Sequence, residues 1–451
     1  MSSSPVRAQV FHYLGFTIAP EQNTVTCRYA LDGREFTEEI RVPGATPEQW
    51  AQPAVVEAAR LLFLLTGVSY YKAGAPPVID LGEHALTARE LAFLREFYID
   101  GLGEFAFRSD PQLDLTDLEI RAPLLERTYP ADFHPAPGRP LLPFGGGVDS
   151  IVSVELLRPI TTEPSLFVVN RPGDTFEAIE KPAVVTGWPV VRAERVIDPQ
   201  ILHAAKGEFF NGHVPVTGII SAIGVLAAAL GGHDAVVMSN EWSASVGTVE
   251  VDGRSINHQY SKSEAFESAF RDVLADAIGT DFQYFSLLRP YTELWIAARF
   301  AELPQYFDTF RSCNRSFHIN LEHRLDHWCG RCDKCCFIDL ILAPFLPAET
   351  LRAVFTRTPE PLDNPELLGK FHTLLGLSPD TKPWECVGDV HECQIAARMA
   401  ADRIDRVGSP ILNRLLVALG PGDPSGEAEQ LMKPVALHHI PERYAPADLL
   451  V

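Results

Sequence analysis

The chain has 451 residues, of which 46% are hydrophobic and 22% charged, and its formal net charge is −21 at pH 7. This length exceeds what one ordinary hydrophobic core organises, so we expect two or three domains. The acidic balance argues against sequence-independent binding to nucleic acid or to an anionic membrane, because both attract basic protein surfaces. An anionic small substrate remains compatible with it, since a pocket sets its own local field.

The N-terminal stretch "MSSSPVRAQVFHYLGF" lacks a basic segment followed by a long apolar one, so we expect no secretory signal. The nearest approach to a membrane span is the apolar run at 216–230, which is rich in Gly and Ala and too short. We therefore expect a cytoplasmic protein. Most of the eight cysteines cluster after residue 312, which in a large cytosolic chain suggests a metal site or chemistry more than a disulfide framework.

Residues 1–135 predict an α+β N-terminal domain. Strand-like stretches such as "TVTCRYAL" (24–31) and "FTEEIRVPG" (36–44) accompany a helical run, "PAVVEAARLLFLLTGVSYY" (53–71). The segment 129–143 then holds five prolines. Because proline interrupts both helices and sheet ladders, we expect a connection between domains there.

Residues 136–310 predict an α/β domain on a parallel sheet. Short apolar runs at 141–144, 165–170, 189–196 and 235–240 alternate with helical runs that begin near 148, 176 and 216. Ligands bind such sheets beyond the carboxyl ends of the strands. The chain places a glycine loop, Asn170 and the segment "SNEWSAS" (239–245) at three of these ends. Residues 311–451 predict a helical, cysteine-containing C-terminal region.

The glycine loop lies in "LLPFGGGVDSIVSVELL" (141–157), between a predicted strand and a predicted helix. Gly145, Gly146 and Gly147 free the backbone to approach a ligand and to direct N–H groups at phosphate oxygens. The helix start adds its positive end, Ser150 adds a hydroxyl, and Asp149 could hold Mg²⁺. The Lys of a Walker loop and the G-x-G-x-x-G spacing of a dinucleotide site are both missing. A glycine-rich turn without a ligand is the plain alternative.

Two further segments carry polar groups toward the same crevice. Asn240 and Glu241 could complete a Mg²⁺ shell, because hard cations take oxygen ligands from more than one loop. Lys262 lies between two serines at a predicted helix start, which suits a phosphate or a carboxylate. An ordinary polar loop and a solvated helix cap explain these two segments in the absence of a ligand.

The sequence "CGRCDKCC" contains two successive C-x2-C steps, and another cysteine precedes it by sixteen positions. This spacing can surround one tetrahedral zinc ion with Cys313, Cys329, Cys332 and Cys335. It resembles the zinc site of the 7-cyano-7-deazaguanine synthases. An iron–sulfur group on the same ligands, or a cluster without metal, are the alternatives.

The stretch "FGGGVDS" resembles the PP-loop, S-G-G-x-D-S, of the ATP pyrophosphatase superfamily, with Gly145 in place of the first serine. Several stretches together resemble one family within it, the ATP-dependent UDP-N-acetylmuramoyl-L-alanyl-L-glutamate epimerases, called MurL. These stretches are "VSYYKAGAP" (68–76), "PFGGGVDS" (143–150), "SNEWSAS", "NHQYSKSEAFE" (257–267), "WCGRCDKCCF" (328–337) and "KPWECVG" (382–388). The resemblance spans nearly the whole chain.

The resemblance implies ATP, Mg²⁺ and a small-molecule substrate, UDP-MurNAc-L-Ala-L-Glu, with release of AMP and pyrophosphate. Adenylation would neutralise the terminal carboxylate, so that a modest base could remove the Cα proton. The residues expected to bind the nucleotide are Phe144, Gly145, Gly146, Gly147, Asp149, Ser150, Asn170 and Asn240. Asp149 and Glu241 would bind Mg²⁺, and Glu241 could alternatively act as an acid or base.

Four side chains are candidates for proton transfer: Cys386 and Cys393 as a pair of thiols on opposite faces of the substrate, and His258 and Lys262 as alternative bases. Buried structural cysteines are the plain reading of the pair. Two other functions use the same glycine loop. One is an adenylating ligase or synthetase that consumes an amine, and the other is a nucleotide sensor without catalysis.

Overall fold

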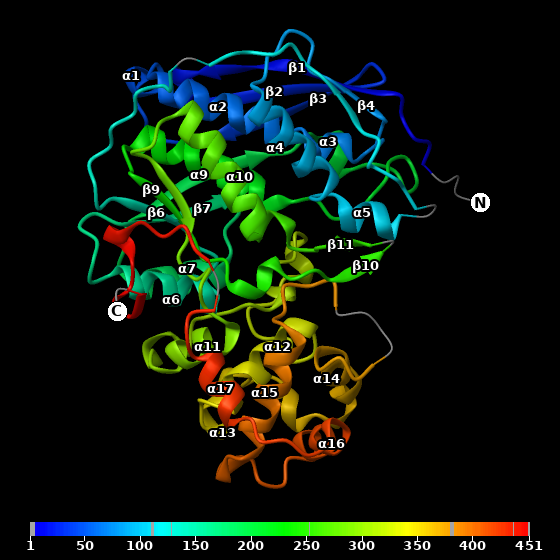
Figure 1. The fold of residues 1–451 in the computed structure, drawn as a ribbon, viewed down its shortest axis with the longest axis vertical. Helices are drawn as coiled ribbons and strands as arrows, with labels where there is room; N and C mark the ends of the chain where they lie inside the picture. Colours follow the sequence, from blue (N-terminus) through cyan, green and yellow to red (C-terminus); the bar gives the residue numbers. More distant parts are fainter. Residues whose placement is uncertain are drawn as a thin grey trace.

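The computed structural model describes residues 5–109, 112–127, 129–251, 253–378, 383–435 and 437–449. Its centre is a ten-stranded sheet in the order β12-β9-β6-β7-β8-β3-β2-β1-β4-β5 (Figure 1). The strands of this sheet are β1 (Val10–Ala19), β2 (Thr24–Leu31), β3 (Arg34–Arg41), β4 (Val78–Asp80), β5 (Glu119–Arg121), β6 (Pro140–Pro143), β7 (Ser165–Asn170), β8 (Val190–Val196), β9 (Ala235–Met238) and β12 (Gln283–Ser286). A separate ribbon pairs β10 (Val249–Val251) with β11 (Arg254–Ile256).

Helices lie on both faces of the part of this sheet that contains β6, β7 and β9, and further helices form a C-terminal group. The helices are α1 (Pro47–Trp50), α2 (Pro53–Thr66), α3 (Val68–Tyr71), α4 (Ala88–Ile99), α5 (Gly103–Arg108), α6 (Val148–Leu157), α7 (Glu177–Thr186), α8 (Pro199–Leu202), α9 (Val216–Gly231), α10 (Glu264–Ala277), α11 (Glu293–Ala301), α12 (Asp333–Leu342), α13 (Ala348–Val354), α14 (Leu368–Leu374), α15 (Val390–Ala401), α16 (Pro410–Leu419) and α17 (Ser425–Leu431). The mixed α/β class predicted from the sequence is therefore confirmed.

The sheet is parallel from β12 through β9, β6 and β7 to β8, as the alternation of strands and helices predicted. Strand β8 then pairs with β3 in the antiparallel sense, through contacts such as Ile40 with Arg195. Strands β3, β2 and β1 continue antiparallel, and β4 and β5 finish the sheet in parallel. The strands before and after the predicted boundary at residue 135 consequently share one sheet.

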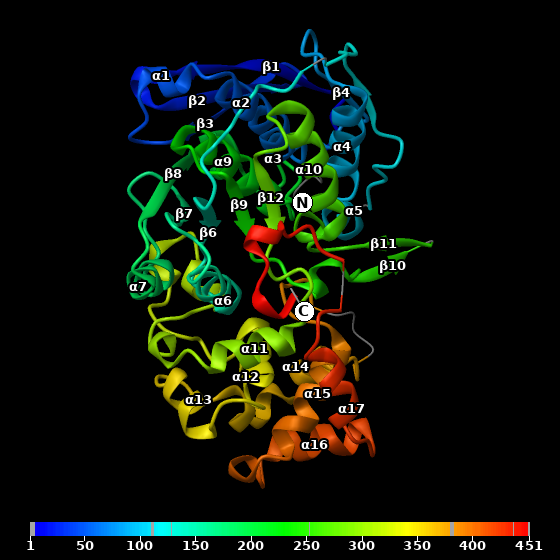
Figure 2. The ribbon, with the colours of Figure 1, turned by 60° about the vertical axis from the view of Figure 1, so that its left-hand side comes forward.

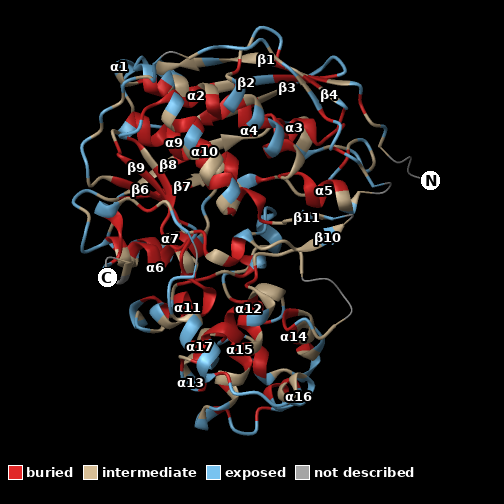
Figure 3. Ribbon diagram, in the orientation of Figure 1, coloured by how far each residue is buried: buried red, intermediate tan, exposed pale blue. Residues whose placement is uncertain are grey.

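The central parallel strands β6, β7 and β9 are apolar on both sides because both of their faces are covered. In β6, Leu141 belongs to the core that includes α2 and α9, whereas Leu142 belongs to the core that includes α6 and α12. The same alternation separates Phe167 from Val168 in β7. Figure 3 shows that buried residues concentrate in β6, β9 and the helices beside them, whereas the outer strands β1 to β3 are partly exposed.

The longest apolar helix is not the run at 216–230 that the sequence suggested. Residues Pro53–Tyr71 form a 19-residue helical stretch with a mean hydropathy of 1.3, long and apolar enough to cross a membrane by length and composition. Of its most apolar window, 83% is buried inside the protein. Helix α2 packs against β1, β2 and α9, so the hydrophobic core accounts for its apolar character.

The C-terminal helices form a second group below the sheet, as Figures 1 and 2 show for α11 to α17. This group contacts the sheet region through α11, which packs on α6. The last described segment returns to the sheet, where the Tyr444 hydroxyl donates to the Asp234 carboxylate at 2.7 Å. The helical C-terminal group therefore lies against the glycine-loop side of the sheet.

Candidate active site

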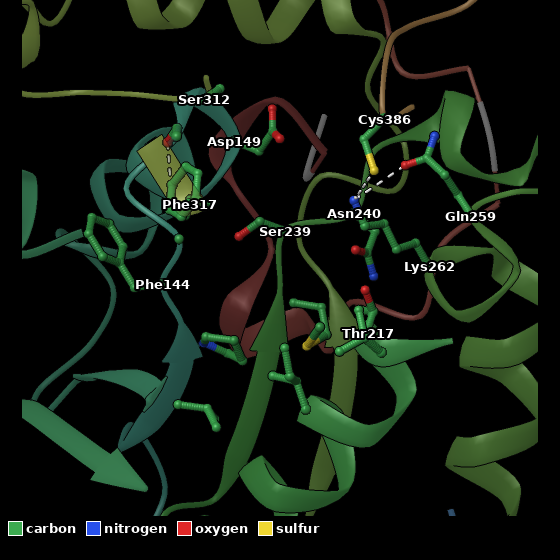
Figure 4. Close-up of a pocket in the computed structure, with 18 of the residues that line it drawn as sticks. Phe144, Asp149, Thr217, Ser239, Asn240, Gln259, Lys262, Ser312, Phe317 and Cys386 are labelled. Atoms are coloured by element: carbon green, nitrogen blue, oxygen red, sulfur yellow. Dashed lines mark hydrogen bonds between the residues drawn. The ribbon is translucent and has the colours of Figure 1, made fainter. Parts of the chain in front are cut away.

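A cavity of about 640 Å³ lies where the parallel strands end and the C-terminal helices begin (Figure 4). One part of its lining comes from the glycine loop and the strand ends: Phe144, Gly145, Gly147, Asp149, Ser150, Ser239 and Asn240. The other part comes from the segments before α9 and α10 and from the C-terminal region: His213, His258, Gln259, Lys262, Arg311, Ser312, Lys334 and Cys386. Segments far apart in the sequence thus meet at the carboxyl edge of the sheet, where the sequence predicted a ligand crevice.

The glycine loop connects β6 to α6 directly. Gly146 has a φ of +72°, and a Cβ atom there would lie 2.2 Å from the carbonyl oxygen of Ala178. A Cβ atom on Gly147 would lie 2.7 Å from Oγ of Ser312. A Cβ atom on Gly145 would meet nothing within 4 Å. Packing and the positive φ therefore require glycine at 146, whereas at 147 the close neighbour is a hydroxyl that can rotate away. Position 145 leaves open space where the loop borders the cavity.

The helix start supplies the polar groups expected beside this loop. Gly147 is the N-cap of α6, and Asp149 and Ser150 lie in its first turn. The first N–H groups of a helix have no partner within the helix and carry its positive dipole end. The Ser150 hydroxyl donates to the carbonyl of Gly147 at 3.1 Å. The arrangement is suited to an anionic group such as phosphate.

Asp149 lies in the cavity wall among several charges. Its burial, and then the nearby Glu241 carboxylate, raise its pKa to about 6, although Lys334 and Lys262 act in the opposite direction. Glu241 is itself buried and lies outside the cavity lining. The pKa of Glu293 in α11 is raised chiefly by its own burial, and then by the nearby charges of Glu241 and Asp149. Two carboxylates that repel each other at a buried position are suited to a shared divalent cation.

Asn240 and Asn170, both expected to bind the nucleotide, differ in whether they line the cavity. Asn240 lines the cavity, and its amide donates to Oγ of Ser286 at 2.9 Å, which fixes the side chain. Asn170 ends β7 as predicted, but its amide donates to the carbonyl of Asp174 at 2.7 Å, and the residue is not among those that line the cavity. The local turn after β7 takes up the polar group of Asn170.

Cys386 lies in the cavity wall, within the loop before α15. The Nζ atom of Lys262 donates to Sγ of Cys386 at 3.1 Å and to Oε1 of Gln259 at 3.3 Å, as Figure 4 shows. Burial would raise the pKa of Cys386, but Lys262, His258 and Lys334 together lower it to about 6. The thiol is therefore ionised near neutral pH.

His258 also borders the cavity, and its imidazole is paired with Glu104. The Nδ1 atom of His258 hydrogen-bonds the Glu104 carboxylate, whose other oxygen accepts from Arg108 at 2.7 Å. Burial would lower the pKa of His258, but Cys386 and Glu104 raise it to about 9. Ligand atoms of Glu104, His213 and His258 lie within 4.8 Å of one another. Because His258 and Arg108 already share the carboxylate, we assign the group as an ion pair and not as a metal site.

Cys393 lies apart from the other predicted proton-transfer groups. It is fully buried on α15, within the core of the C-terminal helices, and it is not among the residues that line the cavity. The structure therefore does not bring Cys386 and Cys393 together at the cavity. The reason is the helical period, because position 393 faces the apolar side of α15, whereas Cys386 precedes that helix in a loop.

The four cysteines expected to bind zinc come together. One Sγ atom from each of Cys313, Cys329, Cys332 and Cys335 lies within 4.8 Å of the others, and Cys336 is outside the group. The Sγ atom of Cys335 lies 3.4 Å from that of Cys332 and 3.7 Å from that of Cys329. Sulfurs around a tetrahedral zinc ion, with Zn–S bonds of about 2.3 Å, are roughly 3.8 Å apart. The residues present therefore fit a structural zinc ion.

Several cavity residues next to these cysteines were not predicted from the sequence. Ser312 precedes Cys313, and Lys334 lies between Cys332 and Cys335 on the first turn of α12. Both line the cavity, as does Arg311. The only sequence signal for them is their position beside the cysteines, since Arg311 and Ser312 precede Cys313 directly. Lys382, part of the stretch 382–388, lies outside the described residues.

Comparisons with known proteins identify the family. A model of the MurL N-terminal domain matches residues 2–287, and a model of the MurL C-terminal domain matches residues 309–429. A protein of Xanthomonas oryzae pv. oryzae is 38% identical over 96% of this chain and 95% of its own length. A relative from Salinispora tropica is 38% identical over 87% of this chain and 84% of its own length. A relative from a Micromonospora species is 35% identical over 98% of each chain. All three relatives are named UDP-N-acetyl-alpha-D-muramoyl-L-alanyl-L-glutamate epimerase. The chain belongs to the MurL family.

Proposed function

We propose that this protein is an ATP-dependent epimerase that inverts the terminal L-glutamate of UDP-MurNAc-L-Ala-L-Glu to D-glutamate, in the synthesis of a peptidoglycan precursor. The names of the relatives support the substrate and the inversion. The use of ATP is supported by one observation above all. The open glycine position at 145 lies beside a helix start, in the wall of a cavity that also contains acidic and cationic groups.

The glycine loop is proposed to hold the triphosphate as a PP-loop does. Main-chain N–H groups at Gly145, Gly146 and Gly147, with the Ser150 hydroxyl, would bind phosphate oxygens. Phe144 and Asn240 would border the nucleotide. Asp149 and the buried Glu241 would hold Mg²⁺, which supplies positive charge to the triphosphate as pyrophosphate leaves.

The chemistry explains why an epimerase would consume ATP. Removing a Cα proton beside a carboxylate places a second negative charge against the first. When the terminal α-carboxylate attacks the α-phosphorus of ATP, pyrophosphate leaves and the acyl-adenylate has no carboxylate charge. The Cα proton then becomes acidic enough for a modest base. Reprotonation on the opposite face and hydrolysis of the adenylate yield D-glutamate and AMP.

The proposed substrate is a soluble small molecule, so this function involves neither nucleic acid nor a membrane as partner and is placed in the cytoplasm. The zinc expected at the cysteine group would have a structural role. It would hold the segment that carries Arg311 and Ser312, and the start of α12 with Lys334, against the glycine loop.

The test is an incubation with ATP, Mg²⁺ and UDP-MurNAc-L-Ala-L-Glu in the absence of any amine. The expected products are D-glutamate in the dipeptide, detected by chiral analysis after hydrolysis, together with AMP and pyrophosphate. Asp149→Asn should stop pyrophosphate release. Asp272→Asn is the control, because Asp272 is exposed and pairs with Arg89, and this variant should still release pyrophosphate. If no D-glutamate forms and a product appears only in a parallel incubation with an added amine, the protein is a ligase, and nucleotide binding without AMP in either incubation would identify a sensor.

A further inference from the structure

Lys262, His258 and Cys386 line one wall of the cavity. The adenylation step proposed above gives these charged side chains no role. We call the set of Cys386, Lys262, His258 and Glu104 the thiolate group. Cys386, Lys262 and His258 line the cavity, and Glu104 lies behind His258, almost fully buried. The four residues come from three separate segments of the chain, because His258 and Lys262 share the stretch before α10, and folding brings these segments together at one position.

Two positive groups converge on the sulfur atom. The ammonium of Lys262 lies 3.1 Å from Sγ of Cys386, and the charge of His258, which also lines the cavity, acts on the same sulfur. Gln259 holds the ammonium from another side at 3.3 Å. The two cations stabilise the sulfur in its ionised form, because an opposite charge within hydrogen-bond distance favours the charged state.

Glu104 fixes the imidazole. It bonds the Nδ1 atom of His258, while the main-chain N–H of His258 donates to Oγ1 of Thr248 at 3.1 Å. Arg108 holds the second oxygen of Glu104 in place. A carboxylate on one ring nitrogen keeps the imidazole protonated and oriented, as in other thiol–imidazole–carboxylate arrangements.

Other charged groups face the thiolate group. Lys334 of α12 adds to the positive field at Cys386, and Asp149 of α6 opposes it. The ring of His213 lies 4.6 Å from that of His258, and burial together with that neighbouring charge lowers the pKa of His213 to about 4. Lys262 and His258 carry their protons at neutral pH, so among the members of the thiolate group that line the cavity, Cys386 is the one in a basic form.

We infer that Cys386 is the base that removes the Cα proton of the adenylated glutamyl residue, and that Glu104 is a positioning residue that acts through His258. This inference rests on the proposed function. The Cα–H bond breaks as the S–H bond forms, and the electron pair passes into the acyl carbonyl. A proton derived from solvent adds to the opposite face of Cα. Water then cleaves the acyl–phosphate bond, AMP leaves, and the thiol returns its proton to solvent.

The first test compares Cys386→Ser with wild type in the absence of added amine. A variant that lacks the base should still adenylate the substrate, and the adenylate should hydrolyse without inversion. We expect AMP and pyrophosphate release within threefold of wild type, D-glutamate formation reduced by about 100-fold or more, and loss of deuterium incorporation at Cα in D2O. Cys27→Ala, in the core of the sheet region, should retain both reactions.

The second test needs no substrate. Iodoacetamide followed by peptide mapping should modify Cys386 at pH 7 at least tenfold faster than Cys27, whose pKa burial raises to about 12. Glu104→Gln should slow modification of Cys386, shift its pH dependence upward, and reduce inversion while AMP release continues. Glu119→Gln, an exposed residue paired with Arg121, is the matched control.

The outcomes separate the two proposals. A wild-type protein that releases no AMP with this substrate overturns the proposed function and this inference together. A wild type that inverts glutamate alongside an equally active Cys386→Ser overturns the inference alone. Loss of AMP release in a folded Cys386→Ser variant also overturns it, because Cys386 would then serve adenylation. A stable acyl adduct on Cys386 would show a nucleophile in place of a base.

Discussion

The main-chain N–H of Arg311 donates to the carbonyl of Gly146 at 3.1 Å, so the segment that leads to the cysteine group is hydrogen-bonded to the glycine loop. The contact at Gly147 and Ser312 lies beside it. The loop proposed to bind ATP therefore derives part of its shape from the C-terminal region.

Gly145 and Gly146 should respond differently to substitution. Gly145→Ser places a side chain in open space at an ordinary φ, so the free energy of unfolding should change by less than about 0.5 kcal/mol. Gly146→Ala should lower it by roughly 1–3 kcal/mol, because the new methyl group meets the Ala178 carbonyl and the backbone has a positive φ. Urea unfolding measures both, and equal destabilisation by the two variants would contradict the geometry.

The cysteine group should contain one zinc ion per chain, measured by elemental analysis of the purified protein. Cys332→Ala should abolish the metal content and lower the melting temperature, because zinc binding in such sites contributes directly to folding. Removal of the metal should also raise the KM for ATP, through the contact of Arg311 with the glycine loop. Cys336→Ala, just outside the group, should retain the metal. Two metal ions per chain would indicate that Glu104, His213 and His258 bind metal as well.

Lys334 should contribute to nucleotide binding without contributing much to stability. Its ammonium lines the cavity and lowers the pKa of Asp149. Lys334→Met should raise the KM for ATP about tenfold, equivalent to roughly 1.4 kcal/mol, with little change in the urea midpoint. Lys370→Met removes a nearby lysine that binds Asp333 and is not among the residues that line the cavity, so its KM should remain near that of wild type.

Glu392 should make stability depend on pH. Burial raises its pKa from 4.5 to about 8, although the Leu294 N–H donates to one carboxylate oxygen at 2.9 Å. Between these values the folded protein binds the proton and the unfolded chain does not, so the free energy of unfolding from this group falls as pH rises. Glu392→Gln should match wild type near pH 5 and exceed its stability at pH 8.5 by roughly 1–4 kcal/mol. The same difference at both pH values would contradict this explanation.

Much of the parallel sheet could be predicted from the sequence, because its signals are local. The apolar runs that became β7, β8 and β9, and the strand–glycine–helix pattern around residue 145, each require only neighbouring residues. The antiparallel pairing of β8 with β3 could not be predicted from such local signals. That pairing connects residues more than 150 positions apart, and no local pattern specifies it.

The site was predictable where a motif carried the chemistry and was missed where tertiary contacts created it. The glycine loop, Asp149 and the four clustered cysteines were named from spacing alone. Glu104 is an ordinary helix residue in the sequence, and only folding places it against His258. Cys393 illustrates the opposite case, because two cysteines in one motif suggested a pair and the helix buried one of them.

The most direct measurement follows an oxygen atom. UDP-MurNAc-L-Ala-L-Glu labelled with ¹⁸O in the terminal α-carboxylate is incubated with the protein, ATP and Mg²⁺, and AMP is analysed by mass spectrometry. If an acyl-adenylate forms and water attacks its carbonyl carbon, one labelled oxygen passes to AMP for each D-glutamate produced. Formation of D-glutamate with unlabelled AMP, or without AMP, would contradict the account.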